Sequence, residues 1–423
     1  MVYVLKNIFK LFLFLFIAFL FLLFLSKNYI LEIIPNYKYI FEQTRAQINE
    51  LYIYGNHLNL KGTLNIENEI IDLNLILFGN KEISYKLNFE ISENSINFFL
   101  SDKKNKGILL DSLEKNSYIA FLKATDINGI NTYYKLINKT NYPETNYYTI
   151  RKNNKSNYIV IKDDRENTLN INVMDKKDDS TDIYDIVIDA GHGGIDPGAC
   201  FNGLCETDFT LTLSKKLKEK LESHGLKVKL TRDDSTPTDK KFETYGQDGR
   251  IDRAMSSKAK YLFSFHLNSG LYTRSGFEIY TTNNIDYTLA KNIASNIVNN
   301  TNTNYSNNPI FKVDEGIYTR TFQNYEIRDV INEANKEGYE PYNITYNTTY
   351  YYIIRETGGF MTGAYTDGRE KDKNLHVNTN VGLESYILEL GYITNPNDTN
   401  DIKANMDKYI EAIGKAIIDN ICE

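Results

Sequence analysis

The chain lacks an excess of positive charge, and it lacks tryptophan altogether. Its 423 residues carry 48 Lys and Arg against 55 Asp and Glu, a net charge of -7. This balance offers no basic face for nucleic acid or anionic lipid, so we expect no nucleic-acid partner. Tyrosine and phenylalanine are abundant, a bias that indicates codon usage and says little about function. The length exceeds what one hydrophobic core organises and predicts about two or three domains.

A long apolar run lies near the N-terminus. Residues 8–25 are apolar apart from Lys10, and as a helix they would extend roughly 27 Å, about the thickness of a bilayer core. Lys6 and Lys10 keep the N-terminus in the cytoplasm under the positive-inside tendency. The residues behind the run lack a small-x-small cleavage pattern, which favours an uncleaved anchor over a cleaved secretory signal. We predict a membrane anchor over residues 1–28, with the remaining chain outside the cytoplasm.

Residues 46–175 alternate short apolar runs with turn residues, for example at 70–78 and 85–91. Period-two alternation at this spacing predicts an antiparallel, sandwich-like β-rich domain. No carboxylate pair, Cys/His cluster or glycine cradle occurs in it. We interpret it as a spacer or small folded module, with a dedicated ligand-binding module as the alternative. The charged, polar residues 176–182 are typical of a linker.

From residue 183 strand and helix patterns alternate. Strands are expected at 183–188, 226–231, 261–266, 276–280 and 385–393, and helices at 208–224, 249–257, 285–299 and 400–421. This alternation predicts an α/β domain over residues 183–423, with a twisted, largely parallel sheet and helices on both faces. Ligands gather at the carboxyl ends of strands in such sheets, where His192 and His266 both fall.

Three residues have the chemistry of a catalytic zinc site. His192 lies in the glycine turn Gly191-His192-Gly193-Gly194, Glu206 begins a helical pattern, and His266 ends a strand. Two histidines and a glutamate are ligands that a hydrolytic zinc takes, with the fourth position left to water. The other histidines, His57, His224 and His376, we interpret as ordinary core or surface residues.

Glu389 is a carboxylate inside an otherwise apolar strand pattern. Desolvation there would raise its pKa toward that of a useful base, whereas a structural glutamate would need its own buried partner. We therefore interpret Glu389 as a catalytic residue.

Several motifs, in the same order along the chain, resemble those of a known enzyme family. They are Ile188 to Ala199 (Ile-Asp-Ala-Gly-His-Gly-Gly-Ile-Asp-Pro-Gly-Ala), Glu206, Leu230-Thr231-Arg232, Arg250 with Ala254, Ser264 to Ser269, Gly276 to Tyr280 and Leu388 to Asn395. The chain from about 183 to 421 resembles the zinc-dependent N-acetylmuramoyl-L-alanine amidases of bacterial cell walls. The resemblance implies that His192, Glu206 and His266 bind Zn²⁺ and that Glu389 is the general base. It also implies peptidoglycan as substrate, cut at the amide between muramic acid and L-alanine. The predicted anchor places this activity on the cell-wall side of the membrane.

Two other functions stay open. A zinc peptidase acting on the stem peptide is the enzymatic alternative, and a protein that binds peptidoglycan without cutting it could keep the same fold. Any regulatory protein partner is unidentified. We assign Arg232 and Arg250 to structural pairing within the sheet and helix layer, with substrate contact as the alternative.

The chain departs from compact family members in two insertions and a cysteine pair. The insertions cover about 317–349 and 359–384, and the first contains a helix candidate at 324–337. One insertion could gate the cleft or lengthen the glycan groove, and a simple loop is the alternative. A disulfide between Cys200 and Cys205 is chemically allowed outside the cytoplasm, but its short span limits the entropic benefit, and we favour free thiols.

Overall fold

The computed structural model describes residues 38–40, 46–66, 69–100, 107–140, 144–151, 155–164, 167–175, 183–236, 248–283, 285–338, 344–358 and 381–422. The predicted membrane anchor over residues 1–28 and the predicted linker over 176–182 lie outside these ranges. Within them, no helix is both long enough and apolar enough to span a bilayer.

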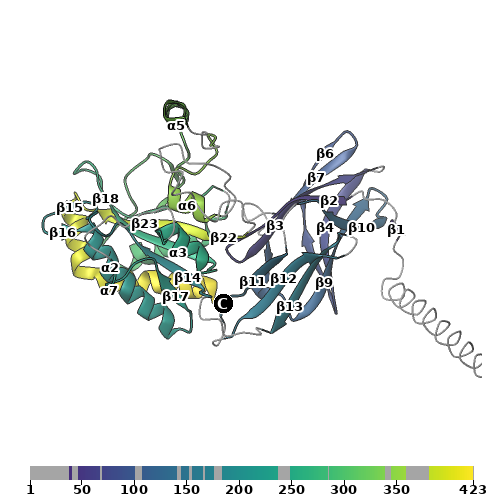
Figure 1. The fold of residues 1–423 in the computed structure, drawn as a ribbon, viewed down its shortest axis with the longest axis horizontal. Coiled ribbons are helices and arrows are strands. Elements are labelled where there is room, and N and C mark those ends of the chain that lie inside the picture. The colour runs from purple at the N-terminus through teal and green to yellow at the C-terminus, as the bar shows by residue number, and fades with distance from the viewer. Residues whose placement is uncertain are drawn as a thin grey trace, which may run out of the picture.

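The first part of the chain is built of strands (Figure 1). They are β1 (Lys38–Ile40), β2 (Ala46–Tyr54), β3 (His57–Asn65), β4 (Ile70–Phe78), β5 (Glu82–Lys86), β6 (Asn88–Ser92), β7 (Ser95–Leu100), β8 (Ile108–Leu109), β9 (Asn116–Asp126), β10 (Asn131–Asn138), β11 (Thr145–Tyr148), β12 (Asn157–Asp163) and β13 (Leu169–Asp175). Most neighbours pair antiparallel, in the path β11-β12-β13-β9-β10-β2-β3-β7-β6. In β9 buried positions alternate with more exposed ones, so one face of the strand supplies the core. The prediction of a β-rich domain is confirmed.

The second part contains a seven-stranded sheet in the order β17-β14-β18-β23-β19-β21-β20. These strands are β14 (Ile186–Ala190), β17 (Val228–Leu230), β18 (Tyr261–Asn268), β19 (Glu278–Tyr280), β20 (Lys312–Asp314), β21 (Ile317–Tyr318) and β23 (Glu384–Tyr392). From β17 to β23 neighbouring strands are parallel, as predicted, but β19 runs antiparallel to β23. Only nine residues connect β18 to β19, too few for the helical crossover that a parallel strand needs. The sheet is therefore mixed.

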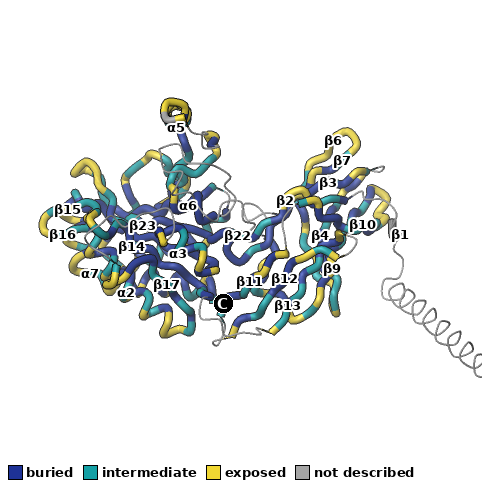
Figure 2. Tube along the Cα trace, viewed as in Figure 1, coloured by how far each residue is buried: buried dark blue, intermediate teal, exposed yellow. Residues whose placement is uncertain are grey.

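Helices cover both faces of this sheet, as the alternation predicted. One face packs against α2 (Glu206–Ser223), α4 (Thr288–Asn300) and α7 (Pro396–Ile421), and the other against α3 (Arg250–Ser256) and α6 (Tyr352–Thr357). In β14, Ile186 and Ile188 point to the first face and Val187 to the second. Because both faces are covered, all five residues of β14 are buried, and the strands form the dark interior of Figure 2.

The helix predicted inside the first insertion is confirmed as α5 (Asn324–Glu337). Gln323 and Glu326 form a capping box at its start, and Gly338 ends it with φ +78°. Most of α5 is exposed, and it projects away from the sheet (Figures 1 and 2). Whether it gates the cleft stays a prediction. Most of the second insertion, residues 359–380, lies outside the described residues.

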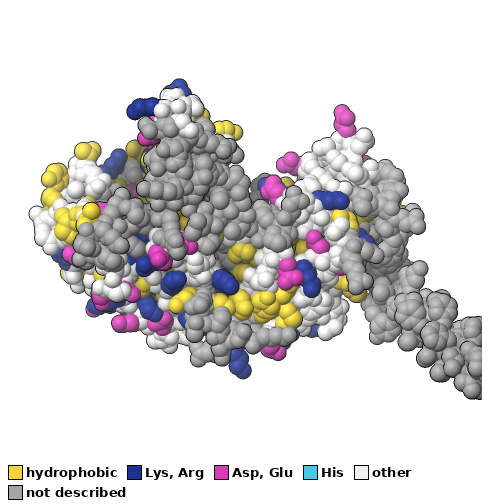
Figure 3. Space-filling model, viewed as in Figure 1, with side chains coloured by type: hydrophobic (Ala, Val, Ile, Leu, Met, Phe, Trp, Pro, Cys, Tyr) yellow, Lys and Arg dark blue, Asp and Glu magenta, His cyan; other side chains and the backbone are white. Residues whose placement is uncertain are grey.

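The charged side chains follow no large pattern on the face shown in Figure 3. Lys and Arg are interspersed with Asp and Glu over both parts of the molecule.

Candidate metal centre

His192 lies in a tight turn directly after β14. Its own φ is +62°, and those of Gly193 and Gly194 are also positive, so the chain turns sharply at this point. A side chain at Gly191 would meet His266: a Cβ built there lies 2.4 Å from the Cε1 atom of that ring. The glycine turn is thus what lets the two histidines approach.

Glu206 is the first residue of α2 and is almost fully buried. Its Oε1 accepts hydrogen bonds from the Leu267 backbone N–H at 2.9 Å and faces His266 Nδ1 at 2.9 Å. Its Oε2 accepts from the Ala199 N–H at 3.1 Å and lies 3.1 Å from His192 Nε2. Burial by itself raises the pKa of Glu206, but the hydrogen bonds to the two histidines outweigh it and lower the pKa, which keeps the carboxylate ionised.

Together, one ligand atom from each of His192, Glu206 and His266 lies within 4.8 Å of the others. Two imidazole nitrogens and a carboxylate oxygen form the donor set of catalytic zinc sites, and the close spacing of the three atoms fits a single ion. The three residues that the sequence proposed as ligands are therefore brought to one place, at the carboxyl ends of β14 and β18.

Asp196 was not singled out from the sequence, yet it contacts the centre. Its Oδ2 lies 3.0 Å from His192 Nδ1, the nitrogen that faces away from Glu206. A carboxylate on the far nitrogen fixes the orientation and tautomer of a metal-binding histidine. Its signal was present in the motif Gly194-Ile195-Asp196-Pro197, where a short acidic side chain follows the histidine at i+4.

Glu389 lies outside the group of three but next to it. It is on β23 directly opposite His266 on β18, and paired residues of neighbouring strands point to the same face of a sheet. Its Oε2 is buried and, within the described part of the chain, makes no hydrogen bond. Burial raises the pKa of Glu389 well above its ordinary value, and the negative charges of Glu206 and Glu278 raise it further.

Glu278 is a buried carboxylate that the sequence reasoning missed. It lies on β19 opposite Glu389, and it accepts hydrogen bonds from Tyr280 Oη at 2.7 Å and Tyr392 Oη at 2.6 Å. Ser306 Oγ at 2.6 Å and Asn268 Nδ2 at 3.0 Å complete its partners. These four hydrogen bonds occupy both carboxylate oxygens of Glu278, whereas Oε2 of Glu389 has no donor within the described part of the chain. The only sequence signal was a glutamate between Phe277 and Ile279 in a buried strand.

Arg232 and Arg250 make structural contacts, as expected. Arg250 Nε donates to Asp189 Oδ1 at 2.8 Å, and a second hydrogen bond joins its Nη2 to Asp189 Oδ2. Arg232 Nε donates to the Ala190 carbonyl at 2.9 Å. Both arginines thereby fix the last residues of β14, directly before His192.

The expectation of free thiols is wrong, because Cys200 and Cys205 form a disulfide. Cys200 begins β15 (Cys200–Phe201) and Cys205 ends β16 (Leu204–Cys205), and the two residues face each other across this hairpin with their Cα atoms 4.1 Å apart. Asn202 and Gly203 form its turn with φ of +49° and +72°. Asn-Gly is the preferred pair for a two-residue hairpin turn, so the sequence did contain the signal that brings the sulfurs together.

The remaining histidines lie away from the centre. His224 is exposed at the end of α2, and His57 begins β3 in the β-rich domain. His376 lies outside the described residues.

The fold and the site define an α/β domain with a hydrolase-type candidate metal centre at the carboxyl ends of its parallel strands. A family model for N-acetylmuramoyl-L-alanine amidase matches residues 186–423. The chain belongs to this family, and the resemblance read from its motifs is confirmed.

Individual relatives match shorter stretches. The uncharacterized protein YqiI of Bacillus subtilis is 35% identical over 112 residues, which cover 26% of this chain and 51% of YqiI. The amidase LytC of the same organism is 31% identical over 113 residues, covering 26% of this chain and 21% of LytC. The chain thus spans about half, or less, of the length of these curated relatives. Among solved structures, the amidase AmiC2 of Nostoc punctiforme aligns over 56% of this chain and 97% of its own, with 23% identity and a TM-score of 0.36.

Proposed function

We propose that this protein is a zinc-dependent amidase that hydrolyses the bond between N-acetylmuramic acid and L-alanine in peptidoglycan. Membership of the family supports a cell-wall amidase. The observation that carries the finer proposal is the convergence of His192, Glu206 and His266, with Glu389 on the adjacent strand.

The residues divide the chemistry between them. A bound zinc ion supplies Lewis acidity and lowers the pKa of a coordinated water. His192, Glu206 and His266 would hold it, and Asp196 would orient the first imidazole. Glu389 then accepts a proton from the attacking water and passes it to the leaving amine of L-alanine, because its raised pKa makes it a stronger base than an exposed carboxylate.

We further propose that the protein is a single-pass membrane protein that acts on the cell-wall side. The support is the apolar run of residues 8–25 with Lys6 and Lys10 at its start. An extracytoplasmic position is also consistent with the disulfide between Cys200 and Cys205.

The test is to incubate the purified full-length chain, loaded with zinc, with peptidoglycan and to analyse the products by mass spectrometry. The amidase releases stem peptides that begin with a free L-alanine amine and leaves glycan without peptide. Fragments cut within the stem peptide would instead establish the zinc peptidase. Retained binding without release would establish the binding protein. A chelator followed by added zinc serves as the control for metal dependence.

A further inference from the structure

A short strand from the C-terminal half of the sequence belongs to the sheet of the β-rich domain. β22 (Val381–Gly382) lies in the C-terminal half of the sequence, yet it pairs in parallel with β2 of the β-rich domain, Ile53 opposite Val381 and Tyr54 opposite Gly382. The Gly55 N–H also donates to the Gly382 carbonyl at 3.0 Å. Two residues after Gly382, β23 begins and pairs with β18. The chain therefore passes directly from the β-rich sheet into the strand that carries Glu389.

Side chains bury this junction from both sides. Tyr54 and Ile150 of the β-rich domain belong to the hydrophobic core of the catalytic domain, with 2% of each exposed. Arg151 Nη1 forms a salt bridge of 2.8 Å with Asp185, which is fully buried next to β14. Lys260, directly before β18, is also buried, and its Nζ lies 5.4 Å from the centre of the Tyr147 ring. Core packing and paired buried charges of this kind are atypical of a flexible spacer.

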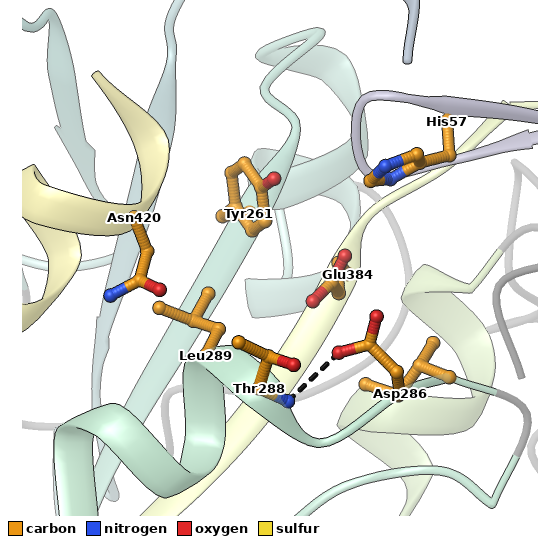
Figure 4. A pocket seen from close by; sticks show the side chains of 8 residues that line it. His57, Tyr261, Asp286, Thr288, Leu289, Glu384 and Asn420 are labelled. Atoms are coloured by element: carbon orange, nitrogen blue, oxygen red, sulfur yellow. Dashed lines mark hydrogen bonds between the residues drawn. The ribbon is translucent and has the colours of Figure 1, made fainter. Parts of the chain in front are cut away.

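The β-rich domain also contacts the first residue of β23. His57 and Glu384 point into one small pocket of about 80 Å³ between the domains (Figure 4). Gly55 lies against Glu384: a Cβ at Gly55 would be 2.8 Å from Glu384 Oε2 and 3.0 Å from Glu384 Cβ. A methyl group added at Gly55 would therefore displace the end of the Glu384 side chain and press on its Cβ.

We propose that the β-rich domain is a positioning element of the catalytic site, which holds Glu389 opposite His266 by fixing the start of β23. This inference rests on the proposed role of Glu389 as general base. Side chains alternate between the two faces of a strand, so a one-residue slip of β23 would turn Glu389 away from the metal centre. β22 directly precedes β23, so its pairing with β2 opposes such a slip. It acts at the first residue of β23, away from Glu389.

The test compares two alanine variants of the full-length, zinc-loaded chain. Gly55→Ala places a methyl group against Glu384. Gly129→Ala is the matched control: it has the same kind of left-handed backbone, with φ +76° against +58°, but its added methyl group would have no atom within 4 Å. We expect Gly55→Ala to lower kcat at least fivefold with KM within twofold, and to speed hydrogen exchange of the β23 amides. Gly129→Ala should keep kcat, KM and β23 exchange at the wild-type values.

A second pair of variants covers the case in which Gly55→Ala does not fold. Arg151→Ala removes the interdomain salt bridge, whereas Arg151→Lys keeps its charge and should restore most of kcat and of the β23 protection. Equal β23 exchange in Gly55→Ala and Gly129→Ala, or equal kcat in both Arg151 variants and wild type, would overturn the proposal. Absence of amide hydrolysis by the wild-type chain would overturn the proposed function instead, and the exchange comparison would still decide whether the β-rich domain fixes β23.

Discussion

At the scale of single residues, three carboxylates near the centre have the same chemistry and different surroundings. Glu206 is bonded to two histidines and two backbone N–H groups, and Glu278 accepts four side-chain hydrogen bonds. Glu389 lies near both of these carboxylates, and its Oε2 has no donor among the described residues. Hydrogen bonds from the two histidines lower the pKa of Glu206, whereas burial and the neighbouring carboxylates raise the pKa of Glu389, which makes Glu389 the group suited to carry a proton.

Replacing Glu389 by glutamine should lower kcat by about 100- to 10,000-fold, the range for loss of a general acid or base. Zinc content should not change, because Glu389 is outside the group of three ligands. Product release from peptidoglycan and metal analysis of the same sample measure both quantities. His192→Ala is the comparison and should lose metal together with activity. Undiminished hydrolysis by Glu389→Gln would refute the general-base role.

The buried pair of Asp189 and Arg250 should control stability. Burial opposes ionisation of Asp189, but Arg250, Ser264 and Thr231 outweigh it and lower its pKa. The ionised Asp189 carboxylate therefore contributes fully to the free energy of unfolding above the ordinary pKa of Asp. This contribution is lost as the pH falls toward the lowered pKa of the folded state. Asp189→Asn leaves a buried arginine unpaired and should reduce the free energy of unfolding at pH 7 by about 3–5 kcal/mol in urea titrations.

The control for that measurement is Asp407→Asn. Asp407 pairs with Lys216 at 2.7 Å, but its side chain is 81% exposed, so its loss should cost less than about 1 kcal/mol. If the two substitutions lowered the free energy of unfolding equally, burial of the Asp189–Arg250 pair would make no contribution to stability.

At the scale of elements, the β15–β16 hairpin connects two predicted metal ligands. It lies between His192 and Glu206 in the chain, and its disulfide closes a loop of six residues. A loop of that size limits the entropic gain to about 2 kcal/mol. The hairpin can nevertheless restrict how far the two ligands separate when no metal is bound.

The double variant Cys200→Ser/Cys205→Ser should therefore lower the free energy of unfolding by up to about 2 kcal/mol and weaken zinc retention. Thermal unfolding and competition with a chromogenic chelator measure the two effects. Cys422→Ser removes a cysteine far along the chain and serves as the control. Unchanged zinc retention in the double variant would show that the hairpin does not preorganise the site.

At the scale of the whole molecule, buried charges join the two domains. Lys260 is fully buried, and desolvation lowers its pKa to about 8, although Asp185 and Asp111 oppose the shift. In the unfolded chain this lysine keeps a pKa near 10.5, so the unfolded state binds more protons between pH 8 and 10.5. The free energy of unfolding should then increase as the pH rises through this window, by up to about 3 kcal/mol from this group.

Urea titrations of wild type and Lys260→Met at several pH values between 7.5 and 10.5 test this expectation. Tyrosine ionisation contributes to both proteins and cancels in their difference. The wild type should gain stability relative to the variant as the pH rises. A constant difference across the window would contradict the lowered pKa of Lys260.

The sequence by itself determined the local elements and the ligand types. Periodicity located β14, β18 and β23 because their buried residues form short apolar runs, and it located α5 at its observed bounds because that helix has its own capping signals. The glycine turn at His192 identified one ligand, and the ordered motifs identified the family.

Only the tertiary structure decided which side chains meet across the sheet. Glu278 and Asp196 have no periodic signal, and their partners come from other strands and loops. The antiparallel direction of β19 and the pairing of β22 with β2 depend on strand neighbours that are distant in sequence. Sheet hydrogen bonds between distant segments leave no local trace, so the role of the β-rich domain could not be read from its own residues.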